Sequence, residues 1–120
     1  MKNNFLAFAT VRLCSTDISK SRNYYQALFE TQPTEDLDNF VSFHIAGVCL
    51  DISVADEKSP SSKGGAVGYW LVEDLDSLVA RAKQIGGVVY RGPLKVQEVQ
   101  RTIIQILDPV GNVMGFEAKF

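Results

Sequence analysis

AVGYWLVEDLDSLVARAKQIGG, residues 66–87, contains a strand, a helix and the signal that ends the helix. Residues 66–72, AVGYWLV, form a run that is typical of a strand. From Asp74 to about Ile85 apolar residues recur at helical spacing, which predicts a helix. Gly86-Gly87 then stops this helix, because glycine is favoured just beyond helix ends.

The same order occurs earlier in the chain. Residues 5–13, FLAFATVRL, predict a strand with two different faces. A helix is expected from about Asp17 to Leu28, because Ser15, Thr16 or Asp17 can cap its first backbone amides. The helix starts Asp17-Ile18 and Asp74-Leu75 are about half the chain apart. An internal duplication of one structural unit explains this repeat.

Three extended segments follow each predicted helix, and a polar connector of residues 55–65, ADEKSPSSKGG, divides the two sets. The segments lie near Gln32–Asp36, Asn39–Ile45 and Val48–Val54 in the first half, and near Val88–Tyr90, Val99–Leu107 and Val113–Ala118 in the second. The chain therefore predicts one domain of two βαβββ modules, about 1–57 and 63–120.

Composition excludes several classes of partner. The formal net charge of −2 leaves no basic field to hold nucleic acid. No apolar run approaches the ~20 residues of a membrane helix, and residues 1–8 lack the features of a signal peptide. The two cysteines, Cys14 and Cys49, are too few for a disulfide framework and are expected to be reduced. We therefore expect a cytoplasmic protein.

The run Asp108-Pro109-Val110-Gly111-Asn112 precedes the last strand, and its proline and glycine suit a tight turn. Together with Tyr24-Tyr25, the two Asp-hydrophobic helix starts and Gly86-Gly87, this turn makes nearly the whole chain resemble the glyoxalase, bleomycin-resistance and dioxygenase (vicinal oxygen chelate) superfamily. The resemblance implies an α+β fold, in which two βαβββ modules form a cup-shaped mixed β-sheet with helices on its outer face.

The enzymes of that superfamily hold a divalent metal with one residue from each of four strands. The resemblance places these positions at Thr10, Asp51, Gly68 and Gly115. Only Asp51 is a strong ligand, whereas a catalytic metal needs about three protein ligands. The single histidine, His44, lies off these positions, which excludes extradiol cleavage. We expect no metal, no cofactor and no catalytic residue, as in the metal-free bleomycin-resistance branch.

The inner side of the cup supplies the candidate ligand-binding residues. Asp51 should project into it, where a cation or a ligand amine must meet the carboxylate. Arg12 or Arg101 could form a structural ion pair with Asp51, or these charges could hold the polar groups of a ligand. The predicted site comprises Phe8, Thr10, Arg12, Asp51, Gly68, Trp70, Arg101, Gly115 and Glu117.

Trp70 is the only tryptophan and shares a strand face with Gly68, which leaves a slot for a planar ring. Alternatively, Trp70 and Phe8 fill the volume that a metal and its ligands would occupy. Tyr24, Tyr25, Phe43 and Tyr69 are interpreted as packing residues without chemistry.

Three functions remain open. The leading interpretation is a non-enzymatic protein that sequesters an antibiotic or aromatic metabolite in a cup at a homodimer interface. The second is a metal-dependent lyase or isomerase of the glyoxalase type, in which Asp51 and Glu117 bind metal with help from His44 or Cys49. The third is a metal-free interaction module whose cup is filled and whose strand edges pair with another protein.

Overall fold

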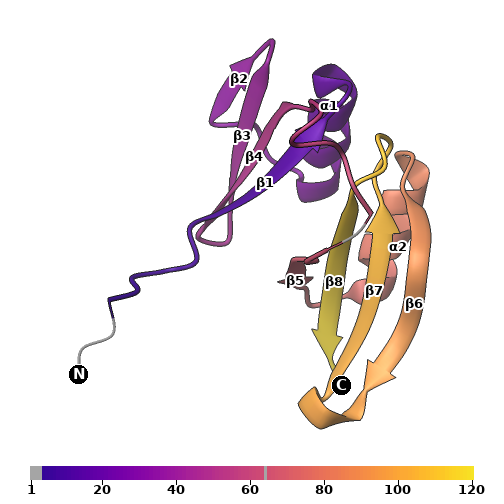
Figure 1. The fold of residues 1–120 in the computed structure, drawn as a ribbon. Coiled ribbons are helices and arrows are strands. Elements are labelled where there is room, and N and C mark those ends of the chain that lie inside the picture. The colour runs from indigo at the N-terminus through magenta and orange to yellow at the C-terminus, as the bar shows by residue number, and fades with distance from the viewer. Residues whose placement is uncertain (1–3, 64) are drawn as a thin grey trace.

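The computed structural model describes residues 4–63 and 65–120. Two modules follow one another along the chain, each with one helix and four strands (Figure 1). The first contains β1 (Thr10–Ser15), α1 (Ile18–Phe29), β2 (Glu35–Leu37), β3 (Phe40–Ile45) and β4 (Val48–Val54). The second contains β5 (Tyr69–Leu71), α2 (Leu75–Gln84), β6 (Val88–Val96), a 3₁₀ turn η1 (Gln97–Val99), β7 (Arg101–Leu107) and β8 (Val113–Lys119). The predicted α+β fold of two βαβββ modules is confirmed.

Each module builds its own four-stranded mixed sheet. The first sheet has the order β1-β4-β3-β2 and the second has the equivalent order β5-β8-β7-β6. In both, the first strand of the module runs parallel to the last, while the other pairs are antiparallel. The identical orders fit the duplication inferred from the sequence, and they leave β1 and β5 at sheet edges.

Both helices begin at the predicted aspartates. The Asp17 carboxylate accepts a hydrogen bond from the Lys20 amide at 3.0 Å, and Asp74 accepts one from the Ser77 amide at 3.0 Å. Each carboxylate thereby satisfies an amide that has no partner within the helix. No helix in the described ranges is long and apolar enough to cross a membrane, and the cytoplasmic location stays a prediction.

The ends of several strands differ from the sequence prediction. Residues 5–9 were expected to belong to the first strand, but β1 begins at Thr10 and the preceding segment runs away from the sheets (Figure 1). Its parallel neighbour β4 begins only at Val48, and the Cys49 amide donates to the Ala9 carbonyl at 2.8 Å, just before the start of β1. A strand needs a hydrogen-bonded neighbour, so β1 begins where β4 begins.

In the second module, β5 is shorter and β6 longer than expected. β5 covers 69–71 rather than 66–72, and β6 extends from Val88 to Val96 rather than to Tyr90. Two register irregularities, between Val89 and Arg91 and between Arg91 and Leu94, let β6 continue past Gly92-Pro93. The sequence placed the end of this segment near Tyr90, but pairing with β7 keeps the following residues in the sheet.

The two modules share one apolar core between their helices and sheets. α1 contributes Tyr25, which is fully buried, and the sheets contribute residues such as Phe43 and Phe116 with exposed fractions of 0% and 1%. The fully assembled cluster contains Tyr24, Tyr25, Leu28, Val41, Phe43, Leu50, Ile52, Ala82, Ile104, Ile106, Met114 and Phe116. The hydrophobic effect therefore holds the modules together as well as each module's own layers.

The turn at 108–112 adds a polar junction between the modules. Asp108 is buried and accepts hydrogen bonds from the amides of Val110 and Asn112 at 3.0 and 2.9 Å. The Tyr25 hydroxyl of α1 donates to the same carboxylate at 2.6 Å. The side-chain amide of Asn112 (Nδ2) donates to the Cys14 carbonyl at 2.8 Å. The second module's turn is thus bonded to the first module's helix and strand.

Candidate functional site

Each sheet has one face covered by the helices and one that we call its open face. In β4, Leu50 and Ile52 are fully buried on the covered side, and Asp51 between them projects to the open face, as expected. The alternation follows from the two-residue period of a strand. The open faces therefore carry the polar residues that the core excludes.

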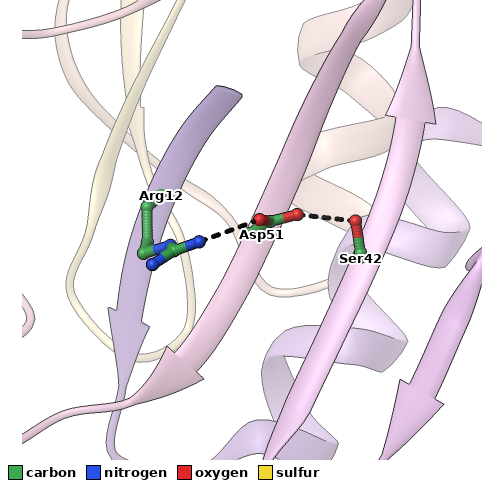
Figure 2. Close-up of polar contacts among 3 residues, drawn as sticks. All are labelled: Arg12, Ser42 and Asp51. Carbon is green, nitrogen blue, oxygen red and sulfur yellow. Dashed lines mark hydrogen bonds and ion pairs between the residues drawn. The ribbon is translucent and has the colours of Figure 1, made fainter. Parts of the chain in front are cut away.

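Asp51 lies at the centre of the first sheet's open face (Figure 2). Its register partners are Arg12 on β1 and Ser42 on β3. One carboxylate oxygen accepts a hydrogen bond from Ser42 Oγ at 2.6 Å, and the other accepts one from Arg12 Nη2 at 3.2 Å. The Asp51 side chain is 12% exposed and that of Arg12 is 62% exposed. Arg12 is thus the cation that Asp51 requires. Of the two arginines that the sequence offered as partners of Asp51, the structure pairs Arg12 with it.

Arg101 occupies a different sheet and has a different partner. Its Nε donates to Glu117 Oε1 at 2.9 Å and its Nη1 donates to the Val99 carbonyl at 3.2 Å. Arg101 opens β7 and Glu117 lies on β8, so this pair belongs to the second sheet's open face. Arg101 therefore does not pair with Asp51.

Trp70 lies on the covered side of the second sheet, away from these charges. Its register partner is the buried Phe116, its ring meets Phe29 of α1 edge-on at 5.4 Å between centroids, and its Nε1 donates to Met114 Sδ at 3.1 Å. The sequence placed Trp70 in the cup beside the charged residues, and the structure corrects this placement. The reason is that alternation fixes only which residues share a face, whereas pairing with β8 decides which face it is.

An apolar cleft of about 410 Å³ separates the edge of the first sheet from the edge of the second. Its volume lies within the range of about 300–1,000 Å³ of small-molecule pockets. The predicted residues Phe8, Gly68 and Trp70 line it, while Thr10, Arg12, Asp51, Arg101, Gly115 and Glu117 do not. Residues that the sequence did not single out complete the lining: Val11, Ala46, Val48, Tyr69 and Leu71.

A larger hollow of about 640 Å³ lies beside the C-terminal end of α1. Its lining comes from a single stretch of chain, Asn23, Gln26, Ala27, Glu30, Thr31 and Gln32. Ligand sites bring together groups from several elements, and this surface beside one helix does not. We therefore place the candidate site at the cleft and the open faces.

Tyr69 is the residue that sequence reasoning missed. Its ring lies directly over Gly115, so that a Cβ atom added at Gly115 would lie 2.5 Å from the ring. Gln105 Nε2 donates to the Tyr69 hydroxyl at 2.8 Å. Alternation in the sequence indicated that Tyr69 and Trp70 point to opposite sides, but nothing in it indicated that Gly115 lies beneath the ring.

The four positions that the family resemblance assigned to a metal do not fit a divalent cation. Asp51 already binds Arg12 and Ser42, and the Tyr69 ring covers Gly115. Within residues 4–63 and 65–120, no three His, Cys, Asp or Glu side chains gather at one point. Asp51 and Glu117, the ligands of the glyoxalase-type alternative, are each already paired with an arginine, Arg12 and Arg101 respectively. A divalent metal needs several oxygen, nitrogen or sulfur donors together, which this donor set lacks.

Comparisons with known proteins agree with the fold. The family model of the Glyoxalase/Bleomycin resistance protein/Dioxygenase superfamily matches residues 7–116. A glyoxalase/bleomycin resistance protein/dioxygenase family enzyme from Burkholderia phytofirmans PsJN superposes with a TM-score of 0.81 at 19% identity, covering 96% of this chain and 100% of that one. A search of curated protein sequences gave no match.

Two further solved structures are similar. A glyoxalase/bleomycin resistance protein from Albidiferax ferrireducens T118 has a TM-score of 0.75 at 17% identity, covering 93% of this chain and 98% of that one. The genomically encoded fosfomycin resistance protein FosX from Listeria monocytogenes has a TM-score of 0.73 at 18% identity, covering 99% and 96%. At these low sequence identities, the similarity shows a shared fold alone.

Proposed function

This chain belongs to the Glyoxalase/Bleomycin resistance protein/Dioxygenase superfamily, and from that premise we propose that it is a non-enzymatic protein that binds a small molecule without a metal. The ligand is planar or partly aromatic, and the protein sequesters it as a homodimer. The proposed ligand is therefore an antibiotic or an aromatic metabolite.

The state of Asp51 carries this proposal. Asp51 is the only strong ligand at the four family positions, and both of its carboxylate oxygens are already engaged, by Arg12 and Ser42. A cation there would have to displace Arg12, and within the described residues no group of three His, Cys, Asp or Glu side chains gathers to hold it. Binding that relies on shape and apolar contact needs no such donors.

The apolar cleft supplies the contact surface. Trp70 and Phe8 present aromatic side chains to it, and Gly68 leaves one wall without a side chain. A flat ring fits such a slot because aromatic surfaces contribute a large contact area in stacked or edge-on arrangements. In this proposal the charged groups of the open faces, Arg12 on the first sheet and the Arg101–Glu117 pair on the second, contact polar groups of the ligand.

A second copy of the chain completes the cup in this proposal. Strands β1 and β5 are sheet edges, and no strand in the described part of the chain pairs with their outer sides. Phe8 and Leu71 near these edges have exposed fractions of 72% and 55%. Exposed edges and apolar side chains favour association, and two-fold symmetric dimers are the commonest solution.

Ligand binding by the metal-stripped protein tests the proposal. The protein is treated with EDTA, dialysed, and titrated with metal-free bleomycin and a panel of planar aromatic compounds, with Trp70 fluorescence and calorimetry as readouts. We expect at least one compound to bind with the same Kd in EDTA and in the presence of Zn²⁺ or Mn²⁺. Stoichiometric metal that survives dialysis, or binding that requires added metal, would contradict the proposal.

A further inference from the structure

The open face of the second sheet carries a row of four residues, of which only Tyr69 also lines the proposed cleft. The strand register places Tyr69 of β5 opposite Gly115 of β8, Gly115 opposite Gln105 of β7, and Gln105 opposite Arg91 of β6. Residues directly opposite one another on neighbouring strands share a face. The row therefore runs across the whole sheet from an aromatic ring to a guanidinium group.

Tyr69 is held as a fixed platform at one end of this row. Gly115 beneath it has no side chain, so the ring lies flat against the β8 backbone. Gln105 fixes the hydroxyl at 2.8 Å, which directs the ring across β8 toward β7. An aromatic ring held on one side and at its polar end offers its other side for stacking at little cost in side-chain entropy.

Arg91 stands at the other end of the row. The register irregularities on both sides of it turn Arg91 to the open face opposite Gln105, although Val89, two residues before, packs against the core. A hollow of about 10 Å³, the size of one water, lies between Tyr69, Arg91, Leu94, Ile103 and Gln105. Arg91 is exposed and forms none of the ion pairs found within residues 4–63 and 65–120.

The charge of this face is opposite in sign to that of the chain. Register places Arg91, Arg101 and Lys119 on it with one carboxylate, Glu117, which makes three positive charges and one negative. The complete chain has a formal net charge of −2. Arg91 is the positive residue of the row, and it lines the same small hollow as Tyr69.

We infer that the open face of the second sheet binds a planar aromatic anion, with the ring on Tyr69 and its carboxylate or equivalent acid group on Arg91. This site is distinct from the cleft, with which it shares only Tyr69, and it rests on the proposed function only in that the protein binds small molecules. Arginine suits the role because it keeps its charge at all working pH values and presents paired N–H donors to a carboxylate.

The test compares 2-naphthoate with the neutral 2-naphthamide by isothermal titration calorimetry on the full chain. Wild type is expected to bind naphthoate about tenfold more tightly than naphthamide, which corresponds to about 1.4 kcal/mol for one charge-assisted contact. Arg91→Gln should remove this preference and leave naphthamide binding unchanged. Tyr69→Leu should weaken both compounds, and Tyr69→Phe, which keeps the ring, should retain most of the affinity.

Lys58→Gln is the matched control, because it makes the same charge change at an exposed residue of the connector that is not part of the row, and it should alter neither affinity. Circular dichroism and thermal unfolding verify that each variant is folded. Equal binding of the two compounds, or naphthoate binding that Arg91→Gln leaves intact, overturns the inference while the proposed function stands. Absence of naphthoate binding overturns it too, and the bleomycin and aromatic panel then decides separately on the proposed function.

Discussion

Tyr25 donates a hydrogen bond of 2.6 Å to the buried carboxylate of Asp108, 83 residues away in the chain. Tyr25 is fully buried and Asp108 has an exposed fraction of 5%. This bond joins α1 of the first module to the turn between β7 and β8 of the second. Burial, reinforced by the charge of Asp108 and by this hydrogen bond, raises the pKa of Tyr25 well above its ordinary value, so the phenol stays protonated and donates.

Tyr25→Phe is expected to lower the free energy of unfolding by about 1.5–3 kcal/mol, the range for a hydrogen bond to a charged group. Asp108 would keep its two backbone donors but lose the hydroxyl. Urea denaturation of wild type and variant measures the difference. Tyr90→Phe is the control, because Tyr90 has an exposed fraction of 48% and its change should stay within about 0.5 kcal/mol. Equal effects of the two substitutions would show that the Asp108 bond is energetically unimportant.

Stability should fall as the solution becomes strongly alkaline. Burial raises the pKa of both Tyr24 and Tyr25 above 10.0, so the folded state keeps protons that the unfolded state releases. The resulting stabilisation is fully present below pH 10 and is lost as the pH rises above it, by about 1.4 kcal/mol per pH unit for each tyrosine. Urea denaturation from pH 9 to 11 checks the slope, which should be shallower in Tyr25→Phe than in wild type.

Gly115→Ala should be strongly destabilising because a methyl group at that position would overlap the Tyr69 ring. Overpacking of this kind costs about 1–3 kcal/mol. Gly68→Ala is the matched control, since its Cβ would meet only Val11 Cγ2 at 3.9 Å. A double-mutant cycle with Tyr69→Ala should show the cost of Gly115→Ala disappearing once the ring is removed. Unchanged cost in the Tyr69→Ala background would mean that the ring is not the obstacle.

Trp70→Ala should affect stability as well as ligand binding, because Trp70 contacts Phe29 and Met114. The expected loss is about 3 kcal/mol, the low end for core aromatic residues, since one part of the side chain faces the cleft. Trp70→Phe keeps most of the packing and is the better probe of binding. Thermal unfolding and ligand titration of both variants separate the two effects, and normal binding by folded Trp70→Ala would remove Trp70 from the proposed site.

Leu71→Glu should convert the proposed dimer into a monomer. Leu71 lies on the edge strand β5 with an exposed fraction of 55%, and a charge there opposes burial against a second copy. Light scattering after size exclusion should give twice the chain mass for wild type and a single mass for the variant. Val99→Glu, in the turn η1 rather than on an edge strand and with a similar exposed fraction of 57%, is the control and should leave the mass unchanged. A monomeric wild type would refute the homodimer.

The elements that could be predicted are those whose signals are local. Asp17 and Asp74 cap the helices through amides only three residues away, so the helix starts were readable without the fold. The segment Val48–Val54 alternates between core and open face, so its bounds and the direction of Asp51 were also correct. Residues 5–9 carry the same kind of alternation and still lie outside β1, because a strand depends on a neighbour that the sequence does not specify.

For the candidate site, too, local features could be predicted and contacts between strands could not. The amino-acid sequence by itself determined the two βαβββ modules, the family and the small number of metal-binding residues at the four family positions, because these depend on residue identity and short-range periodicity. Only the tertiary structure decided that Asp51 pairs with Arg12 rather than Arg101, that Tyr69 covers Gly115 on an open face, and that Trp70 lies on the covered side. Those choices depend on which strands become neighbours and in which register, and that is set by the packing of the whole chain.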